Sequence, residues 1–204
     1  IEQLIKIEKP DIAHIHLLFG GLTPSILPVL KKNKIPVVHS VHDYRLICPA
    51  YTFVNSKGEI CEECRNGKYV NCFKNRCSKG DKLQSAVMAT EMYFRNYLYK
   101  TKNYFQGIIY VSEFSKQLHH SFNQELKLIN SEVIYNSYTA NLINTAKKDI
   151  YYLYFGRLSN EKGLKTLVSA FRILKKIKLK IVGTGPLYNE LKETVETEKL
   201  TNIE

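Results

Sequence analysis

Short apolar runs alternate with longer amphipathic runs along most of this chain. In the second half, Leu164, Val168 and Phe171 recur at the spacing of one helical face. Such alternation is typical of βαβ units, in which helices connect parallel strands. The predicted strands span residues 12–17, 35–41, 107–111, 133–135, 151–155 and 179–182. The predicted helices span residues 23–33, 81–102, 112–118 and about 159–174, with a further helix that begins near 187.

The order of the predicted strands and helices indicates two α/β domains. We expect an N-terminal Rossmann-like domain over 1–136, a polar crossing over 137–149 and a second Rossmann-like domain over 150–204. An insertion at 48–80 interrupts the first domain, because it has little periodicity. The chain begins inside a predicted helix and ends just after a run that predicts another strand. We therefore expect a piece of a longer protein.

Composition places the chain among ordinary globular proteins. It has 204 residues, of which 44% are apolar and 24% are charged. These fractions exclude a disordered or collagen-like chain. No run approaches the roughly 18 uncharged apolar residues that a membrane-spanning helix requires, and no secretory leader is visible.

The formal net charge of +11 favours an anionic partner. Basic residues concentrate in 68–82 and in 162–180, and the second run contains no acidic residue. Such charge suits an anionic small molecule, an anionic membrane surface or nucleic acid. The aromatic and basic stretch 92–100 could lie on a membrane, although core packing explains it better.

Polar residues and glycines follow several predicted strands, where ligands bind in open parallel sheets. In the first domain these residues are His16, His42 and Asp43. In the second domain they are Gly156, Arg157, Gly183 and Gly185. Glycines and caps alone would be ordinary turn chemistry, so the charged residues carry more weight.

The run Phe155-Gly-Arg-Leu-Ser-Asn-Glu-Lys-Gly163 is the sharpest of these features. Gly156 leaves room for a ligand, and Arg157 follows the strand end. Lys162 is expected in the first turn of the next helix, where a cation is unfavourable for the helix dipole unless an anion binds there. Arginine and lysine together suit a diphosphate. A solvated basic turn is the alternative.

The run G-R-L-x-x-E-K-G, followed by Ile181-Val-Gly-Thr-Gly-Pro-Leu187, resembles the donor half of the family-4 (group 1) glycosyltransferases. The resemblance implies the GT-B fold, in which two Rossmann-like domains face each other across a cleft. It also implies that Arg157 and Lys162 hold the donor diphosphate. Gly183 and Gly185 correspond to the glycine turn near the donor nucleotide.

The first part of the chain is similar to the acceptor domain of the same family in the segments 10–16, 37–44 and 109–116. The similarity gives His42 the role of the histidine near the reacting sugar, with His16 and Asp43 on the acceptor side. The family's first strands and its later pair of glutamates have no counterpart here. We therefore expect both domains to be incomplete.

The resemblance implies a retaining transfer of a sugar from a UDP or GDP sugar to a hydroxyl group. It also implies a role in the synthesis of a cell-surface polysaccharide or lipopolysaccharide. The acceptor would be a saccharide or lipid-linked, and the chemistry would need no cofactor. The expected location is the cytoplasm, with peripheral contact at the inner membrane face. Two alternatives remain: a basic nucleic-acid-binding module with a zinc-stapled insert, and a non-catalytic truncated piece. The nucleic-acid module lacks a recognition-helix or RNP-type pattern.

The insertion at 48–80 contains all five cysteines of the chain. Cys48, Cys61, Cys64 and Cys77 are spaced C-x12-C-x2-C-x12-C, and Cys72 is a spare or a substitute for Cys77. Four thiolates can form a tetrahedral site for a structural zinc ion, which would staple a segment that buries little apolar surface. Five reduced cysteines in a loop are an equally weighted alternative.

Overall fold

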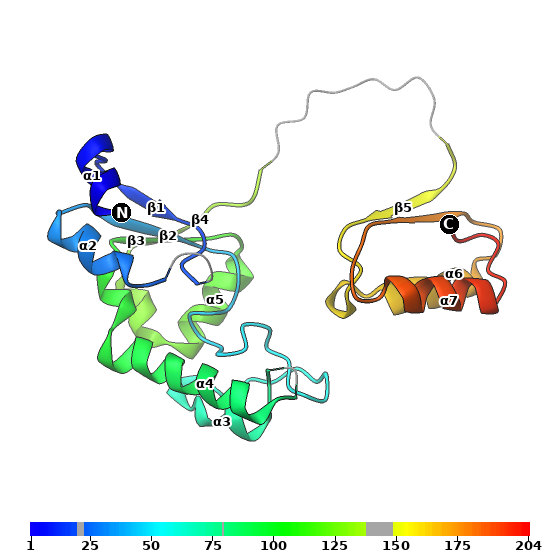
Figure 1. Cartoon of the computed structure of the whole chain (residues 1–204), viewed down its shortest axis with the longest axis horizontal. Coiled ribbons are helices and arrows are strands. Elements are labelled where there is room, and N and C mark those ends of the chain that lie inside the picture. The colour runs from blue at the N-terminus through cyan, green and yellow to red at the C-terminus, as the bar shows by residue number, and fades with distance from the viewer. Residues whose placement is uncertain (20–22, 79, 138–148) are drawn as a thin grey trace. The chain divides into compact units, whose positions relative to one another are not determined.

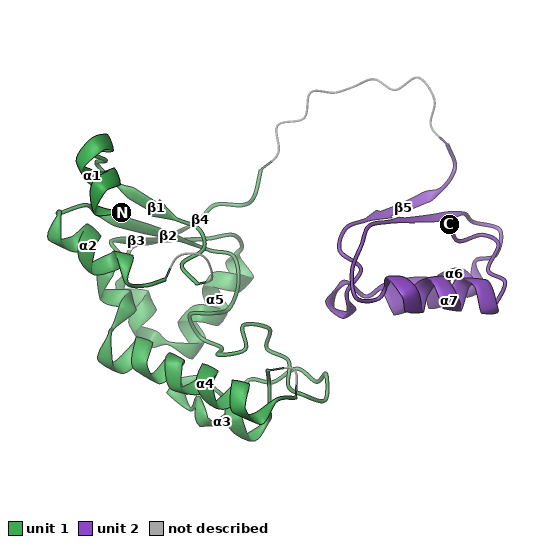
Figure 2. Cartoon of the chain, in the orientation of Figure 1, with its two compact units in different colours: residues 1–139 green, residues 140–204 purple. Residues whose placement is uncertain are grey.

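The computed structural model describes residues 1–19, 23–78, 80–137 and 149–204. The chain divides into two compact units, unit 1 over Ile1–Thr139 and unit 2 over Ala140–Glu204 (Figures 1 and 2). Most of the predicted crossing at 137–149 lies outside the described residues. Among the described residues, no helix has the length and apolar character that crossing a bilayer demands.

Unit 1 is built on a parallel sheet whose strands follow one another in space as they do in the chain. The register places Ile15 beside His39, and His39 beside Ile108, so the central strand β2 is paired on both edges. The strands are β1 (Ala13–Ile15), β2 (Val37–Val41), β3 (Gly107–Tyr110) and β4 (Ser131–Val133). The last strand therefore lies slightly earlier than the predicted 133–135, since Ser131 pairs with Ile108.

Helices connect these strands, as parallel pairing requires. Asp81 caps α4 by accepting a hydrogen bond from the Gln84 amide, and Ser112 caps α5 in the same way from Ser115. The predicted helix at 81–102 is divided into α4, a π-helical turn and a 3₁₀ turn. The α-helices of unit 1 are α1 (Glu2–Glu8), α2 (Ile26–Lys32), α3 (Val70–Lys74), α4 (Lys82–Tyr93) and α5 (Glu113–Phe122). Shorter helical turns are η1 (Arg65–Gly67), η2 (Phe94–Leu98), η3 (Thr101–Tyr104) and η4 (Gln124–Leu128).

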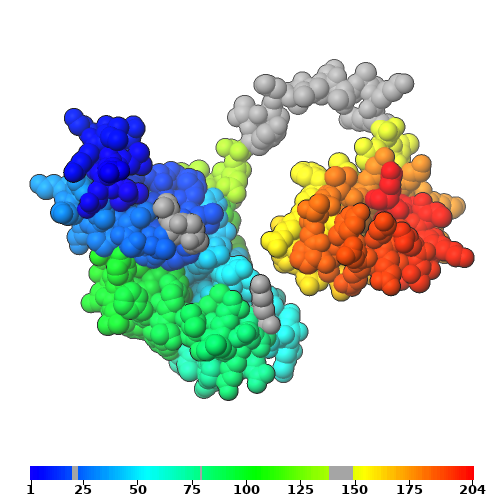
Figure 3. Space-filling view, viewed as in Figure 1, coloured from blue at the N-terminus to red at the C-terminus, as the bar shows by residue number. Residues whose placement is uncertain are grey.

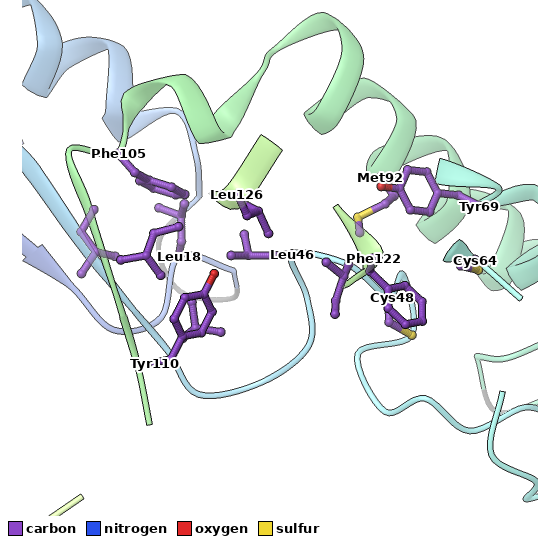
Figure 4. Packing of buried hydrophobic residues seen from close by; sticks show 14 of the residues in the cluster. Leu18, Leu46, Cys48, Cys64, Tyr69, Met92, Phe105, Tyr110, Phe122 and Leu126 are labelled. Atoms are coloured by element: carbon purple, nitrogen blue, oxygen red, sulfur yellow. The ribbon is translucent and has the colours of Figure 1, made fainter. Parts of the chain in front are cut away.

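The core of unit 1 extends from the sheet to the cysteine-rich insertion. Figure 4 shows Tyr110 and Leu18 near the sheet, with Met92, Phe122 and Cys48 further along the same cluster. Met92 and Tyr110 are fully buried. Apolar burial of this kind is the main stabilising term for the unit.

The insertion at 48–80 is better packed than its sequence predicts. It contributes Phe53, Tyr69 and Cys72 to the core of unit 1, and it forms η1 and α3. In the space-filling view the cyan residues of this segment lie against the green residues of α4 (Figure 3). The expectation that it buries little apolar surface was wrong, because aromatic residues without periodicity still reach the core.

Unit 2 is a two-stranded parallel sheet covered on one face by two helices (Figure 1). Tyr154 and Ile181 pack against the helices, whereas Leu153, Phe155 and Val182 are exposed. Residues that alternate along a strand point to opposite faces, so the second face of this sheet is apolar and open. The elements are β5 (Tyr152–Phe155), η5 (Asn160–Lys162), α6 (Leu164–Ile173), β6 (Leu179–Val182) and α7 (Tyr188–Thr197).

The segment after α7 pairs with β6, as the sequence predicts for another strand. Ile203 forms a parallel bridge with Leu179, and the Leu179 amide donates to the carbonyl of Asn202 at 2.8 Å. The amide of Ile181 donates to Glu204 at 2.7 Å. These bonds extend the parallel sheet of unit 2 beyond β6.

Candidate functional site

A group of imidazoles lies at the carboxyl edge of the sheet in unit 1. His16 follows β1 and His42 follows β2, and the His16 Nδ1 atom lies 2.9 Å from His42 Nε2. Their rings are stacked, with centroids 5.2 Å apart. His14 is anchored separately, because its Nε2 atom lies 2.8 Å from the Ser40 hydroxyl. The structure therefore brings His16 and His42, predicted from separate strand ends, into direct contact.

Arg45, two positions later in the chain, holds Asp43 in place. Its carboxylate accepts hydrogen bonds from the Arg45 amide and from Arg45 Nε, each at 2.9 Å. Both side chains are about one third exposed. The turn after β2 therefore presents a paired carboxylate and guanidinium next to His42.

Two buried histidines lie beneath this turn, and no motif in the sequence indicates their role. The His39 Nδ1–H donates to the carbonyl of Ile15 at 3.0 Å, and His119 Nδ1–H donates to the carbonyl of Ser115 at 2.7 Å. Burial lowers the pKa of each to about 4, with Asp43 acting in the opposite direction. Both are therefore neutral near pH 7 and support the edge of the sheet.

In unit 2 the two predicted glycine turns pack directly against each other. The Leu158 amide donates to Thr184 at 2.9 Å, and the Leu187 amide donates to Leu158 at 3.0 Å. A Cβ atom on Gly183 would overlap the carbonyl oxygen of Gly156, and one on Gly185 would overlap the backbone of Leu158. Close backbone approach therefore accounts for both glycines before any ligand is considered.

Arg157 and Lys162 are exposed on the loop that follows β5. Lys162 lies at the end of η5, and Gly163 then adopts a left-handed conformation before α6 begins at Leu164. The expectation that Lys162 lies in the first turn of the helix was wrong, because this glycine separates the 3₁₀ turn from the helix. Within the described residues, neither Arg157 nor Lys162 has an ion-pair partner.

Three of the seven basic residues in the run 162–180 are paired within unit 2. Lys165 lies 2.5 Å from Glu190, Arg172 pairs with Glu198, and Lys180 lies 3.4 Å from Glu204. Exposed ion pairs of this kind add little stability, but they lower the local field available to a polyanion.

The five cysteines line one small cavity in unit 1, and all are free thiols. Burial raises the pKa of Cys48, and it raises the pKa of Cys64 to about 12. A hydrogen bond with Cys72 raises the pKa of Cys77. In the part of the chain that the structure describes, no three or more His, Cys, Asp or Glu side chains are arranged to hold a metal ion. The zinc site therefore stays a prediction.

Unit 2 is similar to a known family. Residues 141–203 match the family model described as Glycosyl transferases group 1. The match includes Gly156, Arg157, Lys162, Gly183 and Gly185, so all the donor-side residues predicted from the sequence lie in the matched segment. No curated protein sequence gave a match.

Solved structures resemble the whole chain. The chain is similar to S. aureus TarM, a mutant in complex with fondaparinux, α-GlcNAc-glycerol and UDP, at 15% identity with a TM-score of 0.53. It is also similar to the GtfA/B complex at 13% identity and a TM-score of 0.52. Each match covers 100% of this chain and 35% or 36% of the other, so the chain spans about a third of the length of these structures. These likenesses confirm the predicted α/β fold of the GT-B type.

Proposed function

We propose that the protein is a retaining glycosyltransferase that moves a sugar from a UDP or GDP sugar to a hydroxyl group of a saccharide or lipid-linked acceptor. The single observation that carries this proposal is the group 1 match over residues 141–203, within which Arg157 and Lys162 stand exposed. UDP in the TarM complex supports a nucleoside diphosphate as the donor.

The chemistry requires stabilisation of a departing diphosphate. As the bond between the anomeric carbon and the diphosphate oxygen breaks, negative charge develops on the leaving group. Arg157 offers a planar fork of donors and Lys162 a point charge, and both act on charge that grows in the transition state. Neither side chain has an ion-pair partner among the described residues, so both are available to the donor.

On the acceptor side, we expect His42 to form a hydrogen bond with the transferred sugar or its phosphate. His16 fixes the ring of His42 through the 2.9 Å contact, and Asp43 is oriented by Arg45. We propose that these residues align the acceptor hydroxyl.

We further propose that the enzyme acts in the cytoplasm, at the inner membrane face. There it takes part in the synthesis of a cell-surface polysaccharide or lipopolysaccharide.

Nucleotide binding by charge-removing variants tests the donor assignment. Calorimetry with UDP and with GDP compares the unchanged protein with Arg157→Ala and Lys162→Ala. Each loss of a charge-assisted contact should weaken binding by about 1.5–3 kcal/mol, or roughly tenfold to a hundredfold. Lys176→Ala is the matched control, because Lys176 is an exposed lysine of the same unit outside the loop.

Two outcomes would overturn the proposal. Equal weakening by Lys176→Ala would indicate a diffuse charge effect. Unchanged nucleotide binding in both loop variants, together with salt-dependent binding to mixed-sequence nucleic acid, would favour the nucleic-acid-binding module instead.

A further inference from the structure

A groove of about 300 Å³ runs across unit 1 from the turn after β2 to the helix α4. Its walls come from three separate stretches of the chain, which the fold of unit 1 brings together. Most of its lining is apolar, from Phe19, Pro24, Pro49, Tyr51, Val87 and Met88. Arg45, Glu91 and Arg95 supply the charged part of the lining.

One end of the groove adjoins the candidate acceptor residues. Arg45 lines the groove and also lines a second hollow that contains His16, His42 and Asp43. Phe19 is likewise shared by the two hollows. The hollow at His42 and the groove therefore adjoin at Phe19 and Arg45.

Each guanidinium in the groove has a carboxylate neighbour. Arg95 is 5% exposed, and its Nη2 donates to the Glu91 carboxylate at 3.0 Å while its Nη1 donates to the carbonyl of Arg45 at 2.8 Å. Arg45 is paired with Asp43. Since each guanidinium has a carboxylate partner, the groove does not require an anionic ligand along its length.

The same guanidinium groups stiffen the aromatic walls. Arg45 lies 4.4 Å from the centre of the Tyr51 ring, and Arg95 lies 4.1 Å from the centre of the Phe19 ring. Stacking of this kind fixes both partners. The groove therefore presents aromatic side walls that are packed against its guanidinium groups.

The far end of the groove continues as an apolar stripe on α4 and η2. Val87 lies in the groove and is 61% exposed, and Leu83, one helical turn before it, is 77% exposed. Glu91, one turn after Val87, interrupts this row, and Phe94 and Leu98 of η2 are exposed beyond it. An exposed row of large apolar side chains is typical of a surface that meets an apolar partner.

We propose that this groove holds the apolar chain of an amphiphilic acceptor, whose hydroxyl-bearing head lies at His42 and Asp43. The inference rests on the proposed function and deepens it, because it selects a lipid-linked acceptor over a free saccharide. The apolar lining begins at Phe19, which the groove shares with the hollow that contains His42, and it extends to Val87 and Met88 on α4.

The two methionines of the chain offer a direct test. Met88 lines the groove and is partly exposed, whereas Met92 is fully buried. With ¹³C-methyl methionine, the protein gives one signal in the groove and one internal reference. Hexyl, heptyl and octyl β-D-glucoside, each below its micelle concentration, should shift the Met88 signal and leave Met92 unmoved. Each added methylene should tighten binding about threefold.

Two variants and free glucose test whether the groove binds the alkyl chain. Val87→Glu should abolish the shift, whereas Leu128→Glu, which changes an exposed leucine outside the groove, should preserve it. A shift that glucose alone produces would overturn the proposal in favour of a saccharide site. Binding that does not strengthen with chain length, or no shift at all, would also overturn it. This measurement needs neither a donor nor sugar transfer. A negative result for the groove would therefore leave the assignment of Arg157 and Lys162 untouched, and loss of that assignment would leave the groove untouched.

Discussion

His16 and His42 share a contact of 2.9 Å between Nδ1 of the first and Nε2 of the second. One nitrogen must donate and the other accept, so the tautomers of the two rings are linked. The residues lie 26 positions apart in the sequence and meet because β1 and β2 are parallel neighbours. His16 is therefore a positioning residue for His42 in the proposed reaction.

We expect His42→Ala to lower kcat for sugar transfer by about a hundredfold or more, since removal of a positioned catalytic side chain typically costs 10²–10⁴. His16→Ala should cost less. His16→Asn should recover part of the loss, because the asparagine side chain presents a polar atom near the place of Nδ1. Steady-state kinetics with a UDP or GDP sugar measure each variant. His120→Gln, a change on α5, serves as the control. Equal rates for His16→Asn and His16→Ala would contradict the positioning role.

The packing of the two loops in unit 2 predicts that Gly183→Ala and Gly185→Ala are destabilising. Each new methyl group would overlap backbone atoms of the opposite loop, and overpacking typically costs about 1–3 kcal/mol. Hydrogen exchange at the amides of Leu158 and Leu187 reports directly on the loop contact. These amides should exchange roughly fivefold or more faster in both variants.

Gly163→Asn is the matched control for the glycine variants. Gly163 also has a positive φ, of 69°, but a Cβ atom there meets nothing within 4 Å, and asparagine tolerates the left-handed region. Its effect on the two amides should be small. If Gly163→Asn accelerated exchange as much as Gly183→Ala, backbone conformation and not loop contact would explain the result.

The sequence predicts the parts of this fold that depend on local pattern. Apolar runs and caps identified the parallel strands and the helices between them, and the strand-end rule identified His16, His42 and Arg157. The pairing of His16 with His42 depends on which strands are neighbours, and the burial of His39 depends on elements far away in the chain. Neither follows from spacing alone.

Two further differences have the same physical origin. The packing of 48–80 comes from aromatic residues such as Phe53 and Tyr69, which contact the core without a repeating pattern. The pairing of Lys165 with Glu190 joins two helices that are separate in the sequence. Long-range contacts of this kind decide how much of a charge run or a cysteine segment is free for a ligand.

The burial of the thiols predicts an order of alkylation. Cys48, Cys64 and Cys72 are at most 8% exposed, whereas Cys61 and Cys77 are partly exposed. With N-ethylmaleimide, Cys61 should be labelled first and Cys72 should be labelled only on unfolding. Mass spectrometry of timed digests measures the order. Uniform protection that a chelator releases would contradict this order and would instead establish the zinc site predicted from the spacing.

The pKa values of His39 and His119, lowered to about 4 by burial, predict that unit 1 loses stability in mild acid. The unfolded chain takes up protons near pH 6.5, before the folded histidines can, so stability falls as the pH drops from about 6.5 toward 4. At pH 5 each histidine accounts for up to about 2 kcal/mol. Asp43 faces both rings and opposes the effect, while His42 faces His39 and His120 faces His119.

Urea unfolding of unit 1 at pH 7.5, 6.5 and 5.0, followed by the signal of the buried Met92 methyl group, measures this loss. His39→Gln should remove about half of the pH dependence, since only His119 then remains. Ile108→Val is the control: it shortens a buried neighbour of His39 in the sheet and should lower stability by about 1 kcal/mol at every pH. A pH dependence that His39→Gln leaves intact would mean that His39 is protonated in the folded protein. The supporting role of this buried imidazole beneath the candidate acceptor site would then be wrong, because a neutral ring is what the surrounding apolar core requires.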